Sequence, residues 1–169
     1  MSFDFHAAYD ELNADDDDSG WADLAVMSGH VAQVFVDDDA WATALADLHR
    51  ALRPGGTLAF ESRDPAARGW ERWSRADTLR TVETIDGPVE FWHETLEVSL
   101  PRVTYATYDR NLATGAEGSD SEVLAFRDVD SLRRSLDQAG FDVTSVYGDW
   151  SRAPVGTMTR ELIMVSRRR

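Results

Sequence analysis

The feature that most constrains the fold is a strand, a helix and a second strand in succession within residues 23–62. The apolar run at residues 23–27 is typical of a strand covered on both faces, and residues 57–62 repeat that pattern. Between them, apolar side chains recur at helical spacing, namely Trp41, Leu45, Leu48 and Leu52. A helix that connects two neighbouring strands in this way makes them parallel, so the sequence predicts an α/β fold whose sheet is mostly parallel.

The middle of the chain follows a different pattern, that of antiparallel hairpins. Alternating polar and apolar residues predict strands, separated by turn residues, at 78–85, 89–99, 102–110 and 121–127. We therefore expect an antiparallel β insertion over about residues 78–127. A short helix at residues 64–73 precedes it. A helix capped by Asp128 follows, with Gly140 just beyond its end, and then strands at 141–147 and 159–166.

The amino terminus is expected to stand apart from this domain. Residues 3–12 have the apolar spacing of a short amphipathic helix, and the acidic run at residues 15–18 is typical of a solvated loop. The predicted organisation is a helix and acidic loop at residues 1–21, followed by a domain at residues 22–169.

Composition excludes several classes of partner and site. The formal net charge of −14 opposes binding to nucleic-acid phosphates, which depends on cationic side chains. No apolar run approaches the roughly 20 residues of a membrane span, so we expect a cytoplasmic protein with no membrane contact. There is no cysteine, and four scattered histidines do not have the spacing of a zinc site, so no metal is expected.

Residues 23–73 resemble the second half of class I S-adenosylmethionine-dependent methyltransferases. The most specific part is LHRALRPGGTLAF at residues 48–60, and the turn Ala139-Gly140-Phe141 also matches. The amino-terminal AAYDELNADDDD is similar to the opening of these enzymes. The resemblance implies an incomplete, truncated Rossmann-like methyltransferase sheet over residues 22–169, with S-adenosylmethionine as cofactor and a small molecule as methyl acceptor.

The resemblance also implies a missing part, because the chain contains no Gly-x-Gly-x-Gly sequence. In the family this loop follows the first strand and lets the backbone approach the cofactor closely. Without it, most of the affinity for the cofactor should be lost. The sheet would also lose its central strand, so we expect a rearranged sheet or a homodimer that covers the exposed edge.

The loop after residue 27 is the first candidate for a functional site, because ligands bind outside the carboxyl ends of the strands in open α/β sheets. The resemblance places Ser28, Gly29 and Gln33 beside the cofactor, and Tyr9 as a lid over it. His30 could act as the catalytic base that deprotonates the acceptor. The alternatives are a loop histidine without chemistry and a Tyr9 that only tethers the amino terminus.

The second candidate is the acceptor site after residue 62. Arg63 could hold a carboxylate or phosphate of the acceptor in a forked contact, although an ion pair with Asp64 or Glu61 is the simpler explanation. Trp70 and Trp73 are the expected substrate-binding aromatics, with Trp92 and Tyr105 as further candidates. Aromatic side chains at such spacing are more often part of the core.

Two functions follow. The first is methyl transfer from S-adenosylmethionine to an oxygen or nitrogen of a small molecule, a reaction that depends chiefly on aligning donor and acceptor. The second is a non-catalytic binding or oligomerisation module with a methyltransferase-like fold, which the missing glycine loop favours.

Overall fold

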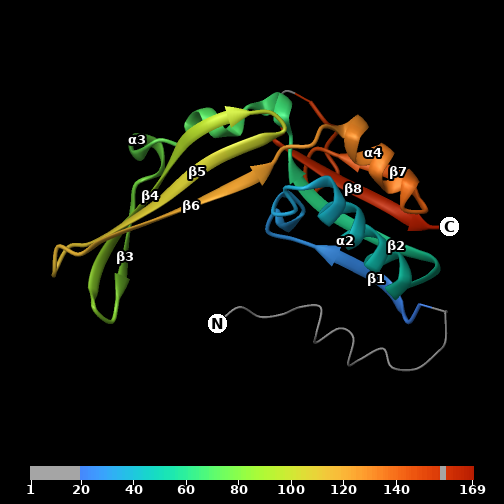
Figure 1. Cartoon of the computed structure of the whole chain (residues 1–169), viewed down its shortest axis with the longest axis horizontal. Helices are drawn as coiled ribbons and strands as arrows, with labels where there is room; N and C mark the ends of the chain where they lie inside the picture. The colour runs from blue at the N-terminus through green and yellow to red at the C-terminus, as the bar shows by residue number, and fades with distance from the viewer. Residues whose placement is uncertain (1–19, 157–158) are drawn as a thin grey trace.

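Two four-stranded sheets make up the protein in a computed structural model that describes residues 20–156 and 159–169 (Figure 1). The expected amino-terminal helix, the acidic loop before residue 20 and Tyr9 lie outside the described residues. We call the two sheets sheet A and sheet B.

Sheet A contains the strand–helix–strand unit predicted from the sequence. Its strand order is β1 (Ala22–Met27), β2 (Leu52–Arg63), β8 (Glu161–Arg168) and β7 (Phe141–Tyr147). β1 and β2 are parallel neighbours, with Met27 opposite Phe60. The crossover between them is helix α2 (Asp38–Ala51). The prediction of a parallel pair joined by this helix is therefore confirmed.

The expectation that sheet A is mostly parallel was wrong. β8 lies antiparallel to both β2 and β7, so only one of the three pairs of neighbouring strands is parallel. Parallel neighbours require a crossover such as α2, whereas β8 follows β7 through a loop and returns between β7 and β2. The resulting sheet is mixed.

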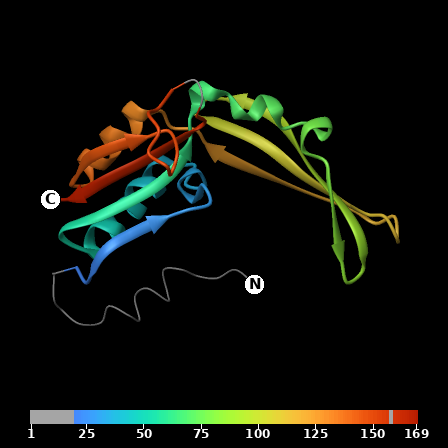
Figure 2. The ribbon, with the colours of Figure 1, turned by 180° about the vertical axis from the view of Figure 1, so that it is seen from behind.

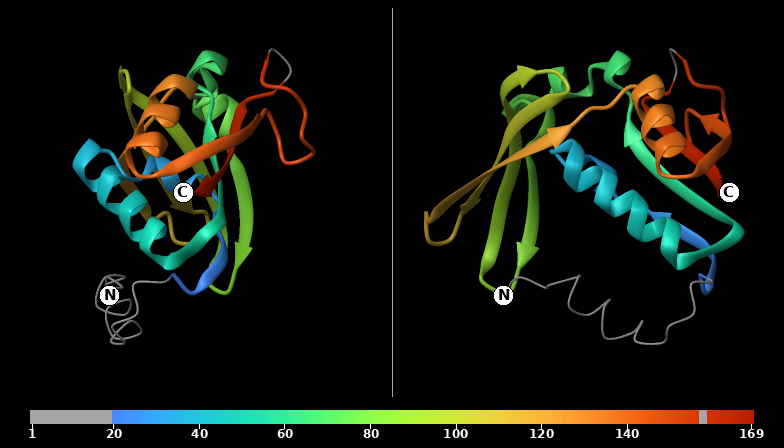
Figure 3. Two further views of the ribbon diagram at one scale, coloured as in Figure 1. Left: turned by 90° about the vertical axis from the view of Figure 1, so that its right-hand side faces the viewer. Right: turned by 45° about the vertical axis from the view of Figure 1, so that its right-hand side comes forward.

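One face of sheet A is covered by α2 and by α4 (Val129–Gln138), which run side by side in the right-hand view of Figure 3. Asp128 caps α4 by accepting a hydrogen bond from the Ser131 amide. The core packs Trp41 and Leu45 of α2, and Leu136 of α4, against Phe60 of β2. The indole of Trp41 meets the Phe60 ring edge-on at 5.6 Å.

The opposite face of sheet A carries no helix of the described part of the chain (Figure 2). At its β1 edge, Leu24 and Val26 are 58% and 54% exposed, and the preceding Trp21 is 63% exposed. β1 pairs with β2 alone, so its outer backbone groups have no strand partner among the described residues. No helix in that part of the chain combines the length and the apolar composition needed to cross a membrane.

Sheet B is the predicted antiparallel insertion. Its strands, in spatial order, are β3 (Arg80–Thr84), β4 (Gly87–Ser99), β5 (Arg102–Asn111) and β6 (Glu117–Ala125). The single helix expected at residues 64–73 is instead two 3-10 turns, η2 (Pro65–Ala67) and η3 (Gly69–Arg72), followed by the short helix α3 (Arg75–Thr78). Trp70 packs with Val103, Leu124 and Phe126 in a second, smaller core.

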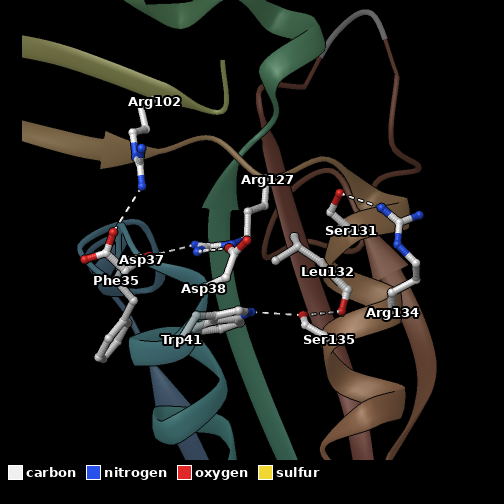
Figure 4. Close-up of polar contacts among 10 residues, drawn as sticks. All are labelled: Phe35, Asp37, Asp38, Trp41, Arg102, Arg127, Ser131, Leu132, Arg134 and Ser135. Carbon is white, nitrogen blue, oxygen red and sulfur yellow. Dashed lines mark hydrogen bonds and ion pairs between the residues drawn. The ribbon is translucent and has the colours of Figure 1, made fainter. Parts of the chain in front are cut away.

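Polar contacts join the end of sheet B to the start of α2 and to the segment just before it, as Figure 4 shows. Arg127, just after β6, donates hydrogen bonds to the Phe35 carbonyl at 2.8 Å and to Asp38 at 3.0 Å. Arg102 of β5 forms an ion pair with Asp37 at 3.0 Å. The Trp41 indole donates to the Ser135 hydroxyl across 2.9 Å and so links the two helices. These contacts fix where sheet B stands relative to sheet A.

Candidate functional site

The candidate site lies where β1 and β2 end together. Because the two strands are parallel and in register at Met27 and Phe60, the residues that follow them meet at one edge of sheet A. They are the loop with Ser28, Gly29 and His30, and the polar end of β2 with Glu61 and Arg63. The predicted neighbourhood of these two groups is confirmed by the pairing of the strands.

Glu61 organises the loop after β1. Its Oε1 accepts hydrogen bonds from the backbone amides of Gly29 at 2.6 Å and His30 at 3.2 Å, and its Oε2 accepts one from the Trp150 indole. Burial raises the pKa of Glu61, but the hydrogen bonds from Trp150, Gly29 and His30 outweigh it, so the pKa lies below its ordinary value. Both Gly29 and His30 have positive φ, which turns their amides toward this one carboxylate.

His30 is paired with a second carboxylate. Its Nε2 lies 2.9 Å from Oε2 of Glu161, at the start of β8, and both side chains are about three-quarters buried, with exposed fractions of 24% and 29%. In the tautomer with the proton on Nε2, His30 donates to this carboxylate and the lone pair of Nδ1 is left to accept a hydrogen bond. Glu161 was not predicted from the sequence, because no local pattern shows that β8 returns beside β2.

Arg63 binds Gln33 rather than an acid. Its Nη1 donates to Gln33 Oε1 across 2.7 Å, and Gln33 Nε2 donates to the Ala125 carbonyl at 3.3 Å. Gln33 in η1 (Val31–Gln33) is fully buried. Within the described residues Arg63 has no carboxylate at ion-pair distance, and Asp64 instead accepts from the Ala66 amide. The simpler explanation of Arg63, an ion pair with Asp64 or Glu61, is not what the structure contains.

The guanidinium of Arg63 also lies 5.4 Å from the centre of the Trp73 ring. Burial lowers the pKa of Arg63, while the negative charge of Glu161 and Glu61 and the phenol of Tyr105 act in the opposite direction. Arg63 is therefore a partly desolvated cation between the end of β2 and an aromatic side chain.

Sheet B contributes two residues near Arg63, namely His93, whose contacts the sequence did not indicate, and Tyr105, one of the further aromatic candidates. His93 of β4 places Nδ1 3.0 Å from the Thr107 hydroxyl, and burial, together with the charges of Arg80 and Arg63, lowers its pKa. Tyr105 donates to Glu122 across 2.5 Å, and burial and this contact raise the pKa of Tyr105 to about 12. A histidine on a strand has no sequence signal that shows which residue of another sheet it faces.

Trp70 and Trp73 line a cavity of about 580 Å³ beside β4, together with residues that include Thr95 and Val98. Trp70 is only 4% exposed and also belongs to the core of sheet B. Trp92 lies on the opposite face of β4 from His93, stacked on Tyr108. A further cavity of about 660 Å³ lies between α2 and α4, and its lining also includes Pro65, Pro101 and Phe126.

Comparisons with known proteins bear on the fold of this chain. No protein-family model matches the sequence, and no curated protein is similar to it. Solved structures do match it. The CcbJ methyltransferase from Streptomyces caelestis superposes with a TM-score of 0.70 at 17% identity, over 92% of this chain and 64% of that one.

Two further solved structures give the same result. An S-adenosylmethionine-dependent methyltransferase from Clostridium acetobutylicum has a TM-score of 0.67 at 12% identity, over 90% of this chain and 60% of that one. An amino pentose methyltransferase from Micromonospora echinaspora has a TM-score of 0.65 at 16% identity, over 92% of this chain and 61% of that one.

This chain has a class I methyltransferase fold. The expected resemblance is thereby confirmed at the level of the fold. The chain spans only 60% to 64% of the length of these three methyltransferases. The loop after β1 and the end of β2 lie outside the carboxyl ends of these two parallel strands, the edge at which open α/β sheets in general bind ligands.

Proposed function

We propose that this chain forms the acceptor side of an S-adenosylmethionine-dependent methyltransferase site for a small molecule. The observation that carries the proposal is the parallel pairing of β1 and β2, which brings His30 and Arg63 to one edge of a sheet with a methyltransferase fold. The amino pentose methyltransferase, with the same fold, acts on a small molecule. Fold alone does not determine function, so the proposal depends on the residues at this edge.

His30 is the residue proposed to accept a proton from the methyl acceptor. Glu161 holds Nε2 at 2.9 Å, so the imidazole is oriented and Nδ1 remains available to a hydroxyl or amine. Glu161 is then a positioning residue, comparable to the carboxylate that fixes the tautomer of a catalytic histidine. Glu61 holds the loop itself in place through the amides of Gly29 and His30.

The described residues fit the cofactor only in part. S-adenosylmethionine, when bound, supplies an electrophilic methyl group, and the loop with Ser28 and Gly29 is the part of this chain proposed to face it. On the outer side of β1, however, Leu24 and Val26 are exposed, and no glycine-rich loop exists in the sequence. Gln33 is buried and engaged at both ends, so we propose that it acts through Arg63.

The second candidate function is a binding or oligomerisation module without catalysis. The β1 edge, which has no strand partner among residues 20–156 and 159–169, and the exposed Trp21, Leu24 and Val26 favour it, because an open strand edge with apolar side chains can pair with another chain. The proposed partner is a second copy of the chain, with the two β1 edges side by side. A symmetric contact of this kind uses the same strand from each copy.

A calorimetric titration of S-adenosylmethionine into the purified chain separates the two candidates. The methyltransferase proposal predicts saturable binding. Because the glycine loop is missing, the dissociation constant should lie above about 10 μM, which corresponds to a binding free energy smaller in magnitude than about 7 kcal/mol. A variant with Ser28 and Gly29 both replaced by proline tests whether the loop binds the cofactor. This variant should give no heat of binding in the titration. If wild-type protein gives no heat at millimolar cofactor, the methyltransferase proposal is wrong and the module remains.

A further inference from the structure

Among the residues that the structure describes, Arg63 has no counterion at contact distance, although the charges of two carboxylates act on it. Glu61 already accepts three hydrogen bonds, from Gly29, His30 and Trp150. Glu161 faces His30, with 2.9 Å between Oε2 and Nε2. Each nearby acid is thus engaged with another group, and neither lies within 4.0 Å of the guanidinium.

The guanidinium is also held in one orientation. Gln33 accepts from Nη1 at 2.7 Å, and Gln33 cannot turn away because it is fully buried and its amide nitrogen donates to the Ala125 carbonyl. The ring of Trp73 lies 5.4 Å from the guanidinium carbon. Since a guanidinium has five N–H donors, the one hydrogen bond that Arg63 makes within the described residues leaves donors for a planar acceptor.

We propose that Arg63 binds an anionic group, a carboxylate or a phosphate, on the small molecule that this site accepts. The claim that this ligand is a methyl acceptor rests on the proposed function, whereas the claim that Arg63 binds an anion does not. A forked contact with two anion oxygens would supply the counterion that Arg63 lacks. Gln33 is the positioning residue of this contact.

The surrounding charge determines which anion fits better. Glu61 and Glu161 are close enough to act on Arg63 through their charges, so a second negative charge on the ligand would be repelled. A carboxylate carries one charge at neutral pH, whereas a phosphate group carries between one and two. The site is therefore expected to bind a carboxylate more tightly than a phosphate.

Titration of the labelled chain with acetate, and separately with inorganic phosphate, tests this proposal by nuclear magnetic resonance. Potassium chloride at matched ionic strength is the reference. Acetate should shift the Nε–H signal of Arg63 and the indole signal of Trp73 in a saturable way, with a lower dissociation constant than phosphate. Equal shifts with chloride would overturn the proposal, and tighter binding of phosphate would overturn the preference for a carboxylate.

Variants of Arg63 show whether the shifts belong to this site. Arg63→Gln should weaken acetate binding about tenfold or more, because a charge-assisted contact is lost. Arg63→Lys keeps the positive charge but cannot make the forked contact with two oxygens, so it should weaken acetate binding about threefold. The matched control is Arg110→Gln, an exposed arginine paired with Glu117 on sheet B, which should leave binding unchanged. Acetate binding that is unchanged in Arg63→Lys overturns the forked contact even if Arg63→Gln does not fold.

The outcome can be separated from that of the proposed function. If acetate binds at Arg63 but S-adenosylmethionine gives no heat, the anion site stands and the methyltransferase proposal falls. If S-adenosylmethionine binds but acetate and phosphate leave the Arg63 signal in place, the acceptor site does not recognise an anion.

Discussion

The guanidinium of Arg63 and the side-chain amide of Gln33 are joined by a hydrogen bond of 2.7 Å across 30 positions of the sequence. Gln33 is fully buried and also donates to the Ala125 carbonyl at the end of β6. One amide therefore ties together the loop after β1, the end of β2 and the last strand of sheet B. The geometry of the candidate site depends on this contact.

Gln33→Leu should destabilise the protein, because it leaves the Ala125 carbonyl and one guanidinium donor without their partner. An unsatisfied buried polar group costs about 1–3 kcal/mol, so we expect the free energy of unfolding to fall by that amount in a urea titration. Gln138→Leu, on an exposed position of α4, is the control and should change it by less than about 0.5 kcal/mol. Equal losses of unfolding free energy in the two variants would mean that the hydrogen bonds of Gln33 do not stabilise the contact between the two sheets.

Arg63→Gln should raise the pKa of His93. Burial and the positive charges of Arg80 and Arg63 lower that pKa, so removal of one charge moves it back toward the ordinary value of about 6.5. It stays below that value because burial remains. Resonance shifts of the His93 ring against pH measure the change. His49 is the internal control, since burial, Arg168 and Arg169 lower its pKa and Arg63 does not act on it.

The same shift has a consequence for stability. A histidine whose folded pKa is lowered stabilises the fold above the unfolded pKa of about 6.5, and this contribution is lost as pH falls through the lowered value. In Arg63→Gln, the part of the unfolding free energy that is lost on acidification because of His93 should be smaller than in the wild type. A pKa of His93 that is identical in the two proteins would show that Arg63 does not face sheet B.

Glu61→Gln should reduce stability at neutral pH but not in acid. The hydrogen bonds from Trp150, Gly29 and His30 outweigh burial and lower the pKa of Glu61, so its contribution is present above the ordinary carboxyl pKa of about 4.3. It is lost as pH falls through the lower folded value. We expect a difference of about 1 kcal/mol in the free energy of unfolding at pH 7 that shrinks below about pH 4.

Because many carboxylates titrate in this acidic chain, the readout is the difference between variant and wild type at each pH. Glu71→Gln is the matched control, since Glu71 is exposed and pairs only with Arg68 at 2.6 Å in the described residues. It should give a small difference at every pH. A Glu61→Gln difference that grows in acid would contradict the assignment of the three hydrogen bonds.

The proposed pairing of two β1 edges predicts a dimer that depends on the apolar side chains of that edge. Leu24→Lys should shift the protein toward monomer, because a charged side chain on an edge strand opposes edge-to-edge pairing. Sedimentation at low protein concentration measures the change, and the control is Ile85→Lys at an exposed position in the turn between β3 and β4. A well-folded wild-type monomer at these concentrations would remove the dimer proposal.

The local pattern of the sequence was sufficient to predict most elements but not how the last strands assemble. Apolar spacing around Trp41, between two apolar strand segments, led correctly to the parallel β1–β2 pair, and turn residues led to sheet B. The position of β8 between β2 and β7 has no such signal, since strand order depends on long-range packing. This is why the sheet is mixed rather than mostly parallel.

The sequence predicted where the candidate site lies but not which side chains contact one another there. His30 and Arg63 were found because they follow two parallel strands. Glu161 was not found, and Gln33 was predicted beside the cofactor rather than as the partner of Arg63, because a hydrogen bond across 131 or 30 residues leaves no trace in local spacing. Arg63 was therefore expected to pair with an acid nearby in sequence, and it pairs with an amide instead.

The most direct test of the account is to map where S-adenosylmethionine binds on the isotopically labelled chain. The account predicts saturable shifts that are largest at the amides of Ser28, Gly29 and His30 and at the end of β2. Shifts confined to other regions, or none at millimolar cofactor, would contradict the claim that the paired ends of β1 and β2 form one side of a methyltransferase site.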